Sequence, residues 1–126
     1  MSYRLHRGDL PEGVDLGPVV AVDTETMGLN PHRDRLCLVQ LSAGDGEAHL
    51  VQLFQDAYRA PRLKRLLADP GITKLFHFAR FDLAMLYRYL GVMATPVYCT
   101  KIASRLARTF TDRHGLRDLC KDLLGI

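Results

Sequence analysis

Hydrophobic and polar positions repeat along this chain with two different periods, and each period predicts its own kind of element. Short apolar runs rich in β-branched residues, or with two-residue alternation, predict strands; they cover residues 18–23, 35–42, 48–53, 73–78 and 96–99. Apolar residues spaced three and four positions apart predict helices; they cover 61–68, about 80–90, 101–110 and 116–124. Because strands and helices alternate after three initial strands, we expect an α/β fold with a mixed sheet flanked by helices.

Residues between these elements support the assignment. The Ala-Gly-Asp-Gly segment at 43–46 predicts a turn that joins the second and third strands into an antiparallel meander. Gly91 and Gly125 each follow an apolar helical segment and are expected to end it. The helix at 101–110 is amphipathic. Its expected inward face is Ile102, Leu106 and Phe110, and its expected outward face is Lys101, Arg105 and Arg108.

The composition fits one globular domain over residues 1–126. Of the 126 residues, 48% are hydrophobic and 25% are charged, so a single core is expected and wholesale disorder is not. The longest apolar run, 16–22, is too short to cross a bilayer, and the charged residues 1–15 show no secretory signal. We therefore expect a cytoplasmic protein with no membrane partner. The three cysteines form no C-x-x-C pair, which disfavours a disulfide framework or a cysteine zinc site.

Positive charge gathers toward the C-terminal end of the chain. The net charge is +3, but the segment 99–121 alone carries six basic and two acidic residues. A polyanionic partner and a solvated helix face both account for such a segment.

The strongest chemical signal is a set of three carboxylates at the ends of predicted strands. Asp23 and Glu25 lie two residues apart at the end of an apolar strand, so both side chains point to one face. Such a pair either binds a hard divalent cation or forms a solvated strand end. Asp82 follows another strand, near the start of a helix, where a carboxylate also suits the helix N-terminus. Three acids so placed suggest two-metal phosphoryl chemistry, with His77 as either a core or a substrate-side residue.

Two longer segments around these acids resemble a known family. Val-Asp-Thr-Glu-Thr-Met-Gly-Leu at 22–29 and Phe-His-Phe-Ala-Arg-Phe-Asp-Leu at 76–83 resemble the first two motifs of DEDD 3′–5′ exonucleases of the RNase D branch. The segment 109–125 is similar to the region after the fifth strand of that branch. Four further segments resemble the nano-RNase C group most closely; they are 5–10, 28–36, 99–104 and 112–116.

The resemblance implies an RNase H-like (DnaQ-like) fold and hydrolysis of very short RNA from its 3′ end to 5′-mononucleotides. It also implies two Mg²⁺ or Mn²⁺ ions and a ring-shaped homo-oligomer, with an octamer as the suggested size. The implied catalytic and metal-binding residues are Asp23, Glu25 and Asp82. The implied substrate-binding residues are Thr26, Met27, Gly28, Leu29, His77, Arg80, Phe81, Arg113 and His114.

One part of the family pattern has no counterpart here. The last motif, Tyr-x-x-x-Asp, would supply the fourth acid, and none of the five tyrosines is followed by Asp four positions later. We therefore expect the chain to be the N-terminal portion of an exonuclease domain whose C-terminal part is missing. Three alternatives remain open: an exonuclease completed by residues beyond Ile126, a catalytically silent RNA-binding or assembly module, and a nuclease in which Asp118 or Asp122 replaces the missing acid.

Overall fold

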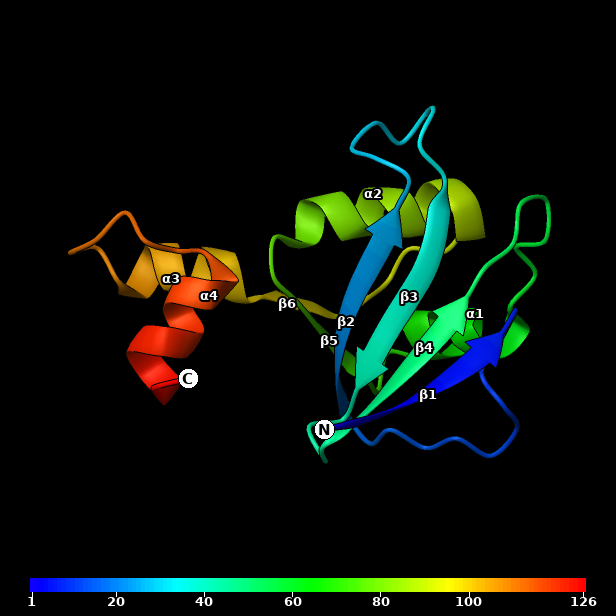
Figure 1. Ribbon diagram of the computed structural model, residues 1–126, viewed down its shortest axis with the longest axis horizontal. Helices are drawn as coiled ribbons and strands as arrows, with labels where there is room; N and C mark the ends of the chain where they lie inside the picture. Colours follow the sequence, from blue (N-terminus) through cyan, green and yellow to red (C-terminus); the bar gives the residue numbers. More distant parts are fainter.

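Six strands form one mixed sheet in the computed structural model, which describes residues 1–126 (Figure 1). The strands are β1 (Ser2–Arg7), β2 (Val19–Thr26), β3 (Leu36–Ser42), β4 (Glu47–Gln52), β5 (Thr73–Phe76) and β6 (Val97–Cys99). The helices are α1 (Pro61–Ala68), α2 (Ala79–Leu90), α3 (Thr100–Ala107) and α4 (Leu116–Leu119), which continues as the π-helical turn η1 (Cys120–Leu124). None of these helices combines the length and the hydropathy that crossing a membrane requires.

The strand order across the sheet is β1-β4-β3-β2-β5-β6. Strands β2, β3 and β4 are antiparallel neighbours, which confirms the predicted meander, while β5 and β6 run parallel to β2. The sequence pattern did not predict β1, which pairs in parallel with β4 at the edge of the sheet. Its apolar residues Tyr3 and Leu5 are exposed, so this strand is held by backbone pairing more than by burial.

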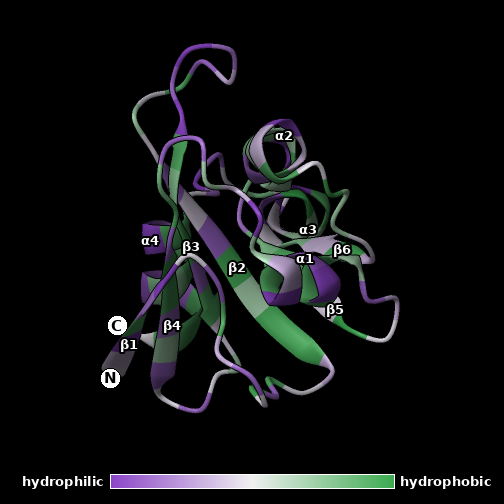
Figure 2. Ribbon diagram, turned by 90° about the vertical axis from the view of Figure 1, so that its right-hand side faces the viewer, coloured by the Kyte–Doolittle hydropathy of each residue, from purple (hydrophilic) through white to green (hydrophobic).

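Helices α1 and α2 cover one face of the sheet, and the core lies between them and the strands (Figure 2). The spacing of Leu63, Leu66 and Leu67 turns one face of α1 inward, as predicted, and all three are buried. In α2 the buried apolar positions are Ala79, Met85, Leu86 and Leu90, and Gly91 ends the helix with a left-handed backbone at φ 66°. The mixed α/β sheet flanked by helices is therefore confirmed.

A carboxylate from the N-terminal loop completes the start of α1. Asp9 accepts hydrogen bonds from the backbone amides of Arg62, at 3.0 Å, and Leu63, at 2.9 Å. The residue that precedes the helix, Ala60, provides no side-chain cap of its own. Asp9 thus satisfies donors that every helix leaves free in its first turn, and it ties the loop to the core.

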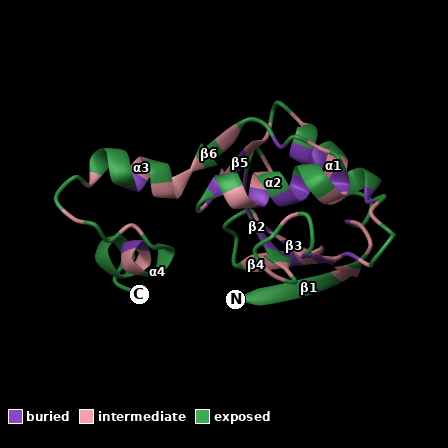
Figure 3. Cartoon of the chain, turned by 90° about the horizontal axis from the view of Figure 1, so that it is seen from above, coloured by how far each residue is buried: buried purple, intermediate pink, exposed green.

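The prediction for the segment 101–110 is wrong in two respects. Helix α3 ends at Ala107, and its expected inward residues Ile102, Leu106 and Phe110 are between 58% and 81% exposed. The reason is placement: α3 follows the last strand, β6, and projects beyond the sheet with α4, so no core layer covers it (Figures 1 and 3). Arg108, expected to face outward, instead has a side chain only 12% exposed.

Candidate active site

The candidate site lies where two neighbouring parallel strands separate. Strand β2 pairs with β5 only from Val19 to Ala21, because β5 ends at Phe76 and the chain then turns into α2. Beyond that point one edge of β2 has no strand beside it, and the N-terminal turn of α2 approaches instead. Ligands of open α/β sheets bind in such crevices, beyond the carboxyl ends of the strands.

Asp82, in the first turn of α2, closes this edge of β2. Its Oδ1 atom accepts a hydrogen bond from the Thr24 hydroxyl at 2.6 Å and another from the Thr24 backbone amide at 3.2 Å. The residue is only 4% exposed. Burial raises the pKa of Asp82 to about 6; the Thr24 hydroxyl opposes this rise and the charge of Asp23 adds to it. A cation bound near these two carboxylates would offset their mutual repulsion and favour the charged form of Asp82.

Asp23 and Glu25 alternate with Thr24 along β2 and are exposed on the opposite face, the one that α1 and α2 leave free. The Gln40 side-chain amide, on the adjacent strand β3, donates to Glu25 Oε1 at 3.2 Å. A β-bulge follows directly, since the register with β3 shifts between Glu25 and Thr26. Bulges next to functional sites commonly re-aim the chain that follows.

The structure brings two of the three predicted acids together. Asp23 is close enough for its charge to raise the pKa of Asp82, whereas Glu25 is held by Gln40. No three carboxylate, imidazole or thiol groups converge tightly enough to hold an ion as they stand. The donor set, carboxylate oxygens on two adjoining elements, is the chemistry that hard cations such as Mg²⁺ and Mn²⁺ prefer. The side chains of Asp23, Glu25 and Asp82 are therefore of the chemical type that a divalent-metal site requires.

A cavity of about 460 Å³ adjoins Asp23 on the free face of the sheet. It lies between the strands and the start of α4, and its polar lining residues are Asp23, Gln40, Ser42, His77 and Thr100. A pocket of this size, mostly apolar with a few convergent polar groups, is typical of a small-ligand site.

His77 reaches this cavity from the end of β5 in a defined orientation. The Thr100 hydroxyl donates to the Phe76 carbonyl at 3.1 Å, so it accepts from His77 Nδ1–H at 3.0 Å. Burial lowers the pKa of His77, and the nearby charge of Lys101 lowers it further. The His114 carbonyl partly opposes this. His77 is thus a neutral imidazole at pH 7, suited to hydrogen bonding rather than to ion pairing.

The segment that follows β2 presents two apolar side chains to solvent. Met27 is 69% exposed and Leu29 is 83% exposed, and both lie directly beyond the strand that carries Asp23. The Thr26 hydroxyl donates to the Gly28 carbonyl at 2.6 Å and so stiffens the segment. This is the placement expected of residues that contact a bound substrate.

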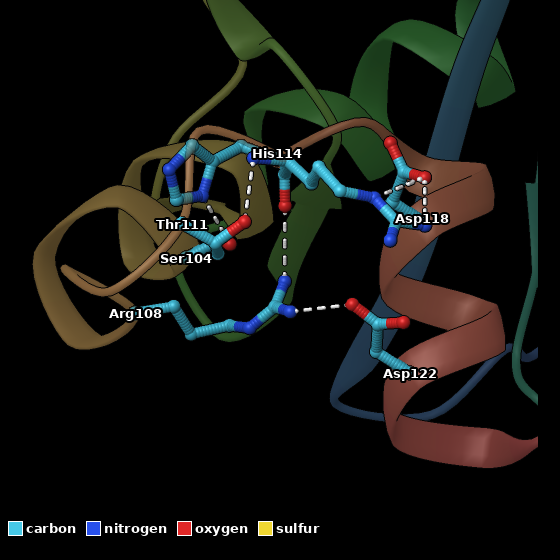
Figure 4. A network of polar contacts seen from close by, with 7 residues as sticks. Ser104, Arg108, Thr111, His114, Asp118 and Asp122 are labelled. Atoms are coloured by element: carbon cyan, nitrogen blue, oxygen red, sulfur yellow. Dashed lines mark hydrogen bonds and ion pairs between the residues drawn. The ribbon is translucent and has the colours of Figure 1, made fainter.

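The remaining predicted substrate residues make contacts outside the group formed by Asp23, Thr24 and Asp82. Phe81 packs partly buried against the core, and Arg80 lines a separate apolar groove between α2 and α3. Arg113 donates to Asp118 at 2.8 and 3.1 Å, and His114 Nδ1 lies 2.7 Å from the Ser104 hydroxyl (Figure 4).

Ion pairs also engage both acids considered as replacements for the missing fourth carboxylate. Arg108 donates to Asp122 at 2.7 Å, and its second guanidinium nitrogen donates to the Arg113 carbonyl at 3.1 Å (Figure 4). The Arg113 contact lowers the pKa of Asp118. These pairs give Asp118 and Asp122 a role within the α3–α4 segment and disfavour them as metal ligands.

Three residues of this site were not expected from the sequence: Thr24, Gln40 and Thr100. Each acts by orienting a predicted residue, namely Asp82, Glu25 and His77. The alternation of β2 does place Thr24 on the helix-facing side of the strand, but only the approach of α2 shows what it contacts.

Comparison with known proteins places these features in a family context. The sequence model of the 3′-5′ exonuclease family matches residues 9–126. Ribonuclease D of Granulibacter bethesdensis is 34% identical over 108 residues, which cover 86% of this chain and 27% of the relative. The structure of Brucella melitensis NrnC with bound Mg²⁺ is 56% identical, with a TM-score of 0.96, and the match covers all of this chain and 63% of NrnC.

NrnC of Brucella melitensis has also been solved bound to pGG, with a TM-score of 0.97 and 62% of that chain covered. Escherichia coli RNase D, an exoribonuclease involved in structured RNA processing, is 26% identical, with a TM-score of 0.69; the match covers 86% of this chain and 28% of that one. These similarities confirm the expected RNase H-like fold. The chain spans about a quarter of the length of both ribonucleases D and less than two thirds of NrnC.

Proposed function

Because the chain belongs to the 3′-5′ exonuclease family, we propose that it forms part of an exoribonuclease that degrades very short RNA from the 3′ end. The observation that carries the proposal is the arrangement of Asp82 at the open edge of β2, hydrogen-bonded to Thr24 and within the field of Asp23. Hydrolysis adds one water to the scissile phosphorus and breaks its bond to O3′. It leaves a 5′-mononucleotide and a 3′-hydroxyl on the shortened RNA.

We assign two Mg²⁺ or Mn²⁺ ions to the carboxylates of Asp23, Glu25 and Asp82. When bound, divalent ions in such a site neutralise phosphate charge and activate the attacking water. The protein's own part is to fix the ligands: Thr24 orients Asp82, and Gln40 orients Glu25. A relative with the same fold was solved with Mg²⁺, which supports the use of a divalent metal.

The substrate side of the site is proposed for the residues around this centre. Met27 and Leu29 contact bases, since they are exposed and apolar, while the bond from the Thr26 hydroxyl to the Gly28 carbonyl sets their position. Neutral His77, whose Nδ1–H is bonded to Thr100, accepts a hydrogen bond from the sugar at Nε2. Contacts of this kind suit RNA, which proteins recognise through unstacked bases and the 2′-hydroxyl.

Four further residues are proposed to contact the RNA at its edges. Phe81 and Arg80 follow His77 at the start of α2, and Arg113 and His114 belong to the loop before α4. The approach of the His114 carbonyl to His77 supports a role for that loop near the substrate.

A short substrate accords with the modest charge. Binding of long nucleic acid depends on many phosphate contacts and usually on a broad positive surface. The chain has a net charge of only +3, and two of its C-terminal arginines, Arg108 and Arg113, are paired with carboxylates. The pGG-bound relative supports a substrate of two nucleotides.

A second candidate is a catalytically silent RNA-binding or assembly module. The pairing of Asp118 and Asp122 with arginines favours it, because these two acids are then engaged within the α3–α4 segment. We also propose a ring-shaped homo-oligomer, which the exposed apolar residues of α3 support, and a cytoplasmic location, which the three free cysteines support.

The deciding experiment measures mononucleotide release from a 5′-phosphorylated RNA dinucleotide with Mn²⁺. Asp23→Ala should abolish turnover, whereas Asp45→Ala, an exposed acid in the β3–β4 turn, should leave it unchanged. Binding of the dinucleotide without release would favour the silent module. Neither binding nor release would refute both the exonuclease and the RNA-binding module.

A further inference from the structure

The loop between β2 and β3, residues 27–35, is exposed at its tip yet firmly held. The amide of Met27 donates to the Arg35 carbonyl at 3.0 Å, which continues the hairpin past the strand ends. The Asn30 carbonyl accepts from the amides of Arg33, at 3.1 Å, and Asp34, at 2.7 Å. Loops of this length are ordinarily mobile when they lack such internal bonds.

Asp34 is the centre of this internal network. It is only 8% exposed although it lies in a surface loop. Its carboxylate accepts from the Asn30 amide at 2.9 Å and from two guanidinium nitrogens of Arg33, at 2.9 and 3.1 Å. The Arg33 contact, followed by the Asn30 amide, lowers the pKa of Asp34, so the carboxylate stays charged and keeps these partners.

The carboxylate also supports the backbone that carries the exposed apolar residues. A Cβ atom at Gly28 would lie 2.7 Å from Asp34 Cγ and closer still to Oδ2, well inside contact distance. Gly28 has no positive φ, so glycine is required here for space and not for conformation. The Gly28 backbone therefore rests directly on the Asp34 side chain, with Met27 and Leu29 on either side of it.

Two further bonds connect the loop to the elements that carry the acids. The Tyr89 hydroxyl, on α2, donates to the Pro31 carbonyl at 3.0 Å. The Thr26 hydroxyl, at the end of β2, donates to the Gly28 carbonyl at 2.6 Å. The loop is thus fixed relative to both Asp82 and Glu25, which lie on these same two elements.

We infer that Asp34 is a positioning residue that holds Met27 and Leu29 in place to contact the bases of a short RNA. The inference rests on the proposed function. Apolar side chains on a pre-ordered loop lose little conformational freedom on binding, whereas a loose loop must be ordered at the expense of affinity. Asp34 does not touch the substrate; it acts through Gly28 on its two neighbours.

The test measures the Kd of a fluorescent 5′-phosphorylated RNA dinucleotide in Ca²⁺, by anisotropy. Asp34→Ala should weaken binding about tenfold, while Asp34→Asn, which keeps the volume against Gly28 and one acceptor oxygen, should weaken it clearly less. Gly28→Ala should weaken binding through its clash, but should add little to Asp34→Ala, because the clash partner is then gone. Asp45→Ala, whose carboxylate also caps a hairpin turn, is the matched control.

A double-mutant cycle separates positioning from a general effect on the fold. If Asp34 acts through Leu29, then Asp34→Ala should cost less than about threefold in a Leu29→Ala background. A tenfold loss in that background, or no loss in the wild-type background, would overturn the inference while leaving the proposed function intact. A wild-type chain that binds no dinucleotide would refute the proposed function and this inference with it.

Discussion

Replacing Asp82 with asparagine is expected to make the metal-free protein more stable at neutral pH. The buried carboxylate must ionise in a poorly solvated place, next to the charge of Asp23. Asparagine has nearly the same shape, and its side-chain oxygen can still accept the two hydrogen bonds from Thr24. The substitution therefore removes the charge and keeps the contacts.

The magnitude follows from linkage between proton binding and folding. The pKa of Asp82 is about 6 in the folded protein and 3.8 for an ordinary aspartate, a difference that corresponds to about 3 kcal/mol. Folding takes up a proton between these values, so wild-type stability decreases as pH rises from 3.8 to 6 and is then level. The variant also loses the attraction of a charge to the helix N-terminus, up to about 1 kcal/mol. We expect a net gain of about 2–3 kcal/mol at pH 7.5.

Urea unfolding followed by circular dichroism, in EDTA, measures this gain at several pH values. The difference between Asp82→Asn and wild type should shrink steadily below pH 6 and be small at pH 4. Asp23→Asn, at an exposed position, removes only the repulsion that Asp23 adds and should give a smaller gain. A variant that is less stable than wild type at pH 7.5, or a gain that does not depend on pH, would refute the reasoning.

Three further outcomes are expected. Asp9→Ala should lower the free energy of unfolding by about 1 kcal/mol, measured in urea, because α1 loses its cap; an unchanged midpoint would contradict that role. Thr24→Val should lower it by about 1–3 kcal/mol at pH 7.5 by leaving the Asp82 carboxylate without its hydroxyl donor, whereas Thr24→Ser should restore most of the loss. Arg108→Ala should increase amide hydrogen exchange in residues 109–115 while β2 and β3 stay protected, since the contacts of Arg108 hold that loop to α4. Uniform exchange across the chain would show instead that the whole fold had been weakened.

Much of the sheet and of its helical layer could be predicted because local pattern and burial agree there. Helix α1 begins at Pro61 and ends at Ala68 as expected, since proline suits a first helical position and three leucines share the inward face. The meander could be predicted because its short strands are joined by a glycine-rich turn. Strand β1 could not be predicted, because its apolar side chains remain exposed and its pairing depends on a partner distant in sequence.

The amphipathic pattern of α3 predicted a buried face wrongly for a related reason. Apolar spacing predicts which residues share a helix face, but not whether anything covers that face. Ile102 and Leu106 do share one face, on a helix that projects past the last strand. Their exposure depends on where the chain places α3, and no local signal contains that information.

The candidate site also contains residues that the sequence predicts and residues that only the structure shows. The acids Asp23, Glu25 and Asp82 are predicted from residue type, spacing and resemblance, and the structure places Asp23 where its charge raises the pKa of Asp82. The residues that orient them, Thr24 and Gln40, come from long-range contacts that a one-dimensional pattern does not show.

The separation of β2 from β5 also matters for how the protein avoids unwanted association. A strand edge with free backbone amides is a template on which a strand of another molecule can add. At this edge the Thr24 amide is already bonded to the Asp82 carboxylate. The same side chain that makes folding less favourable at neutral pH therefore blocks growth of the sheet there, and an apolar replacement such as Asp82→Leu would leave that edge open to intermolecular strand pairing.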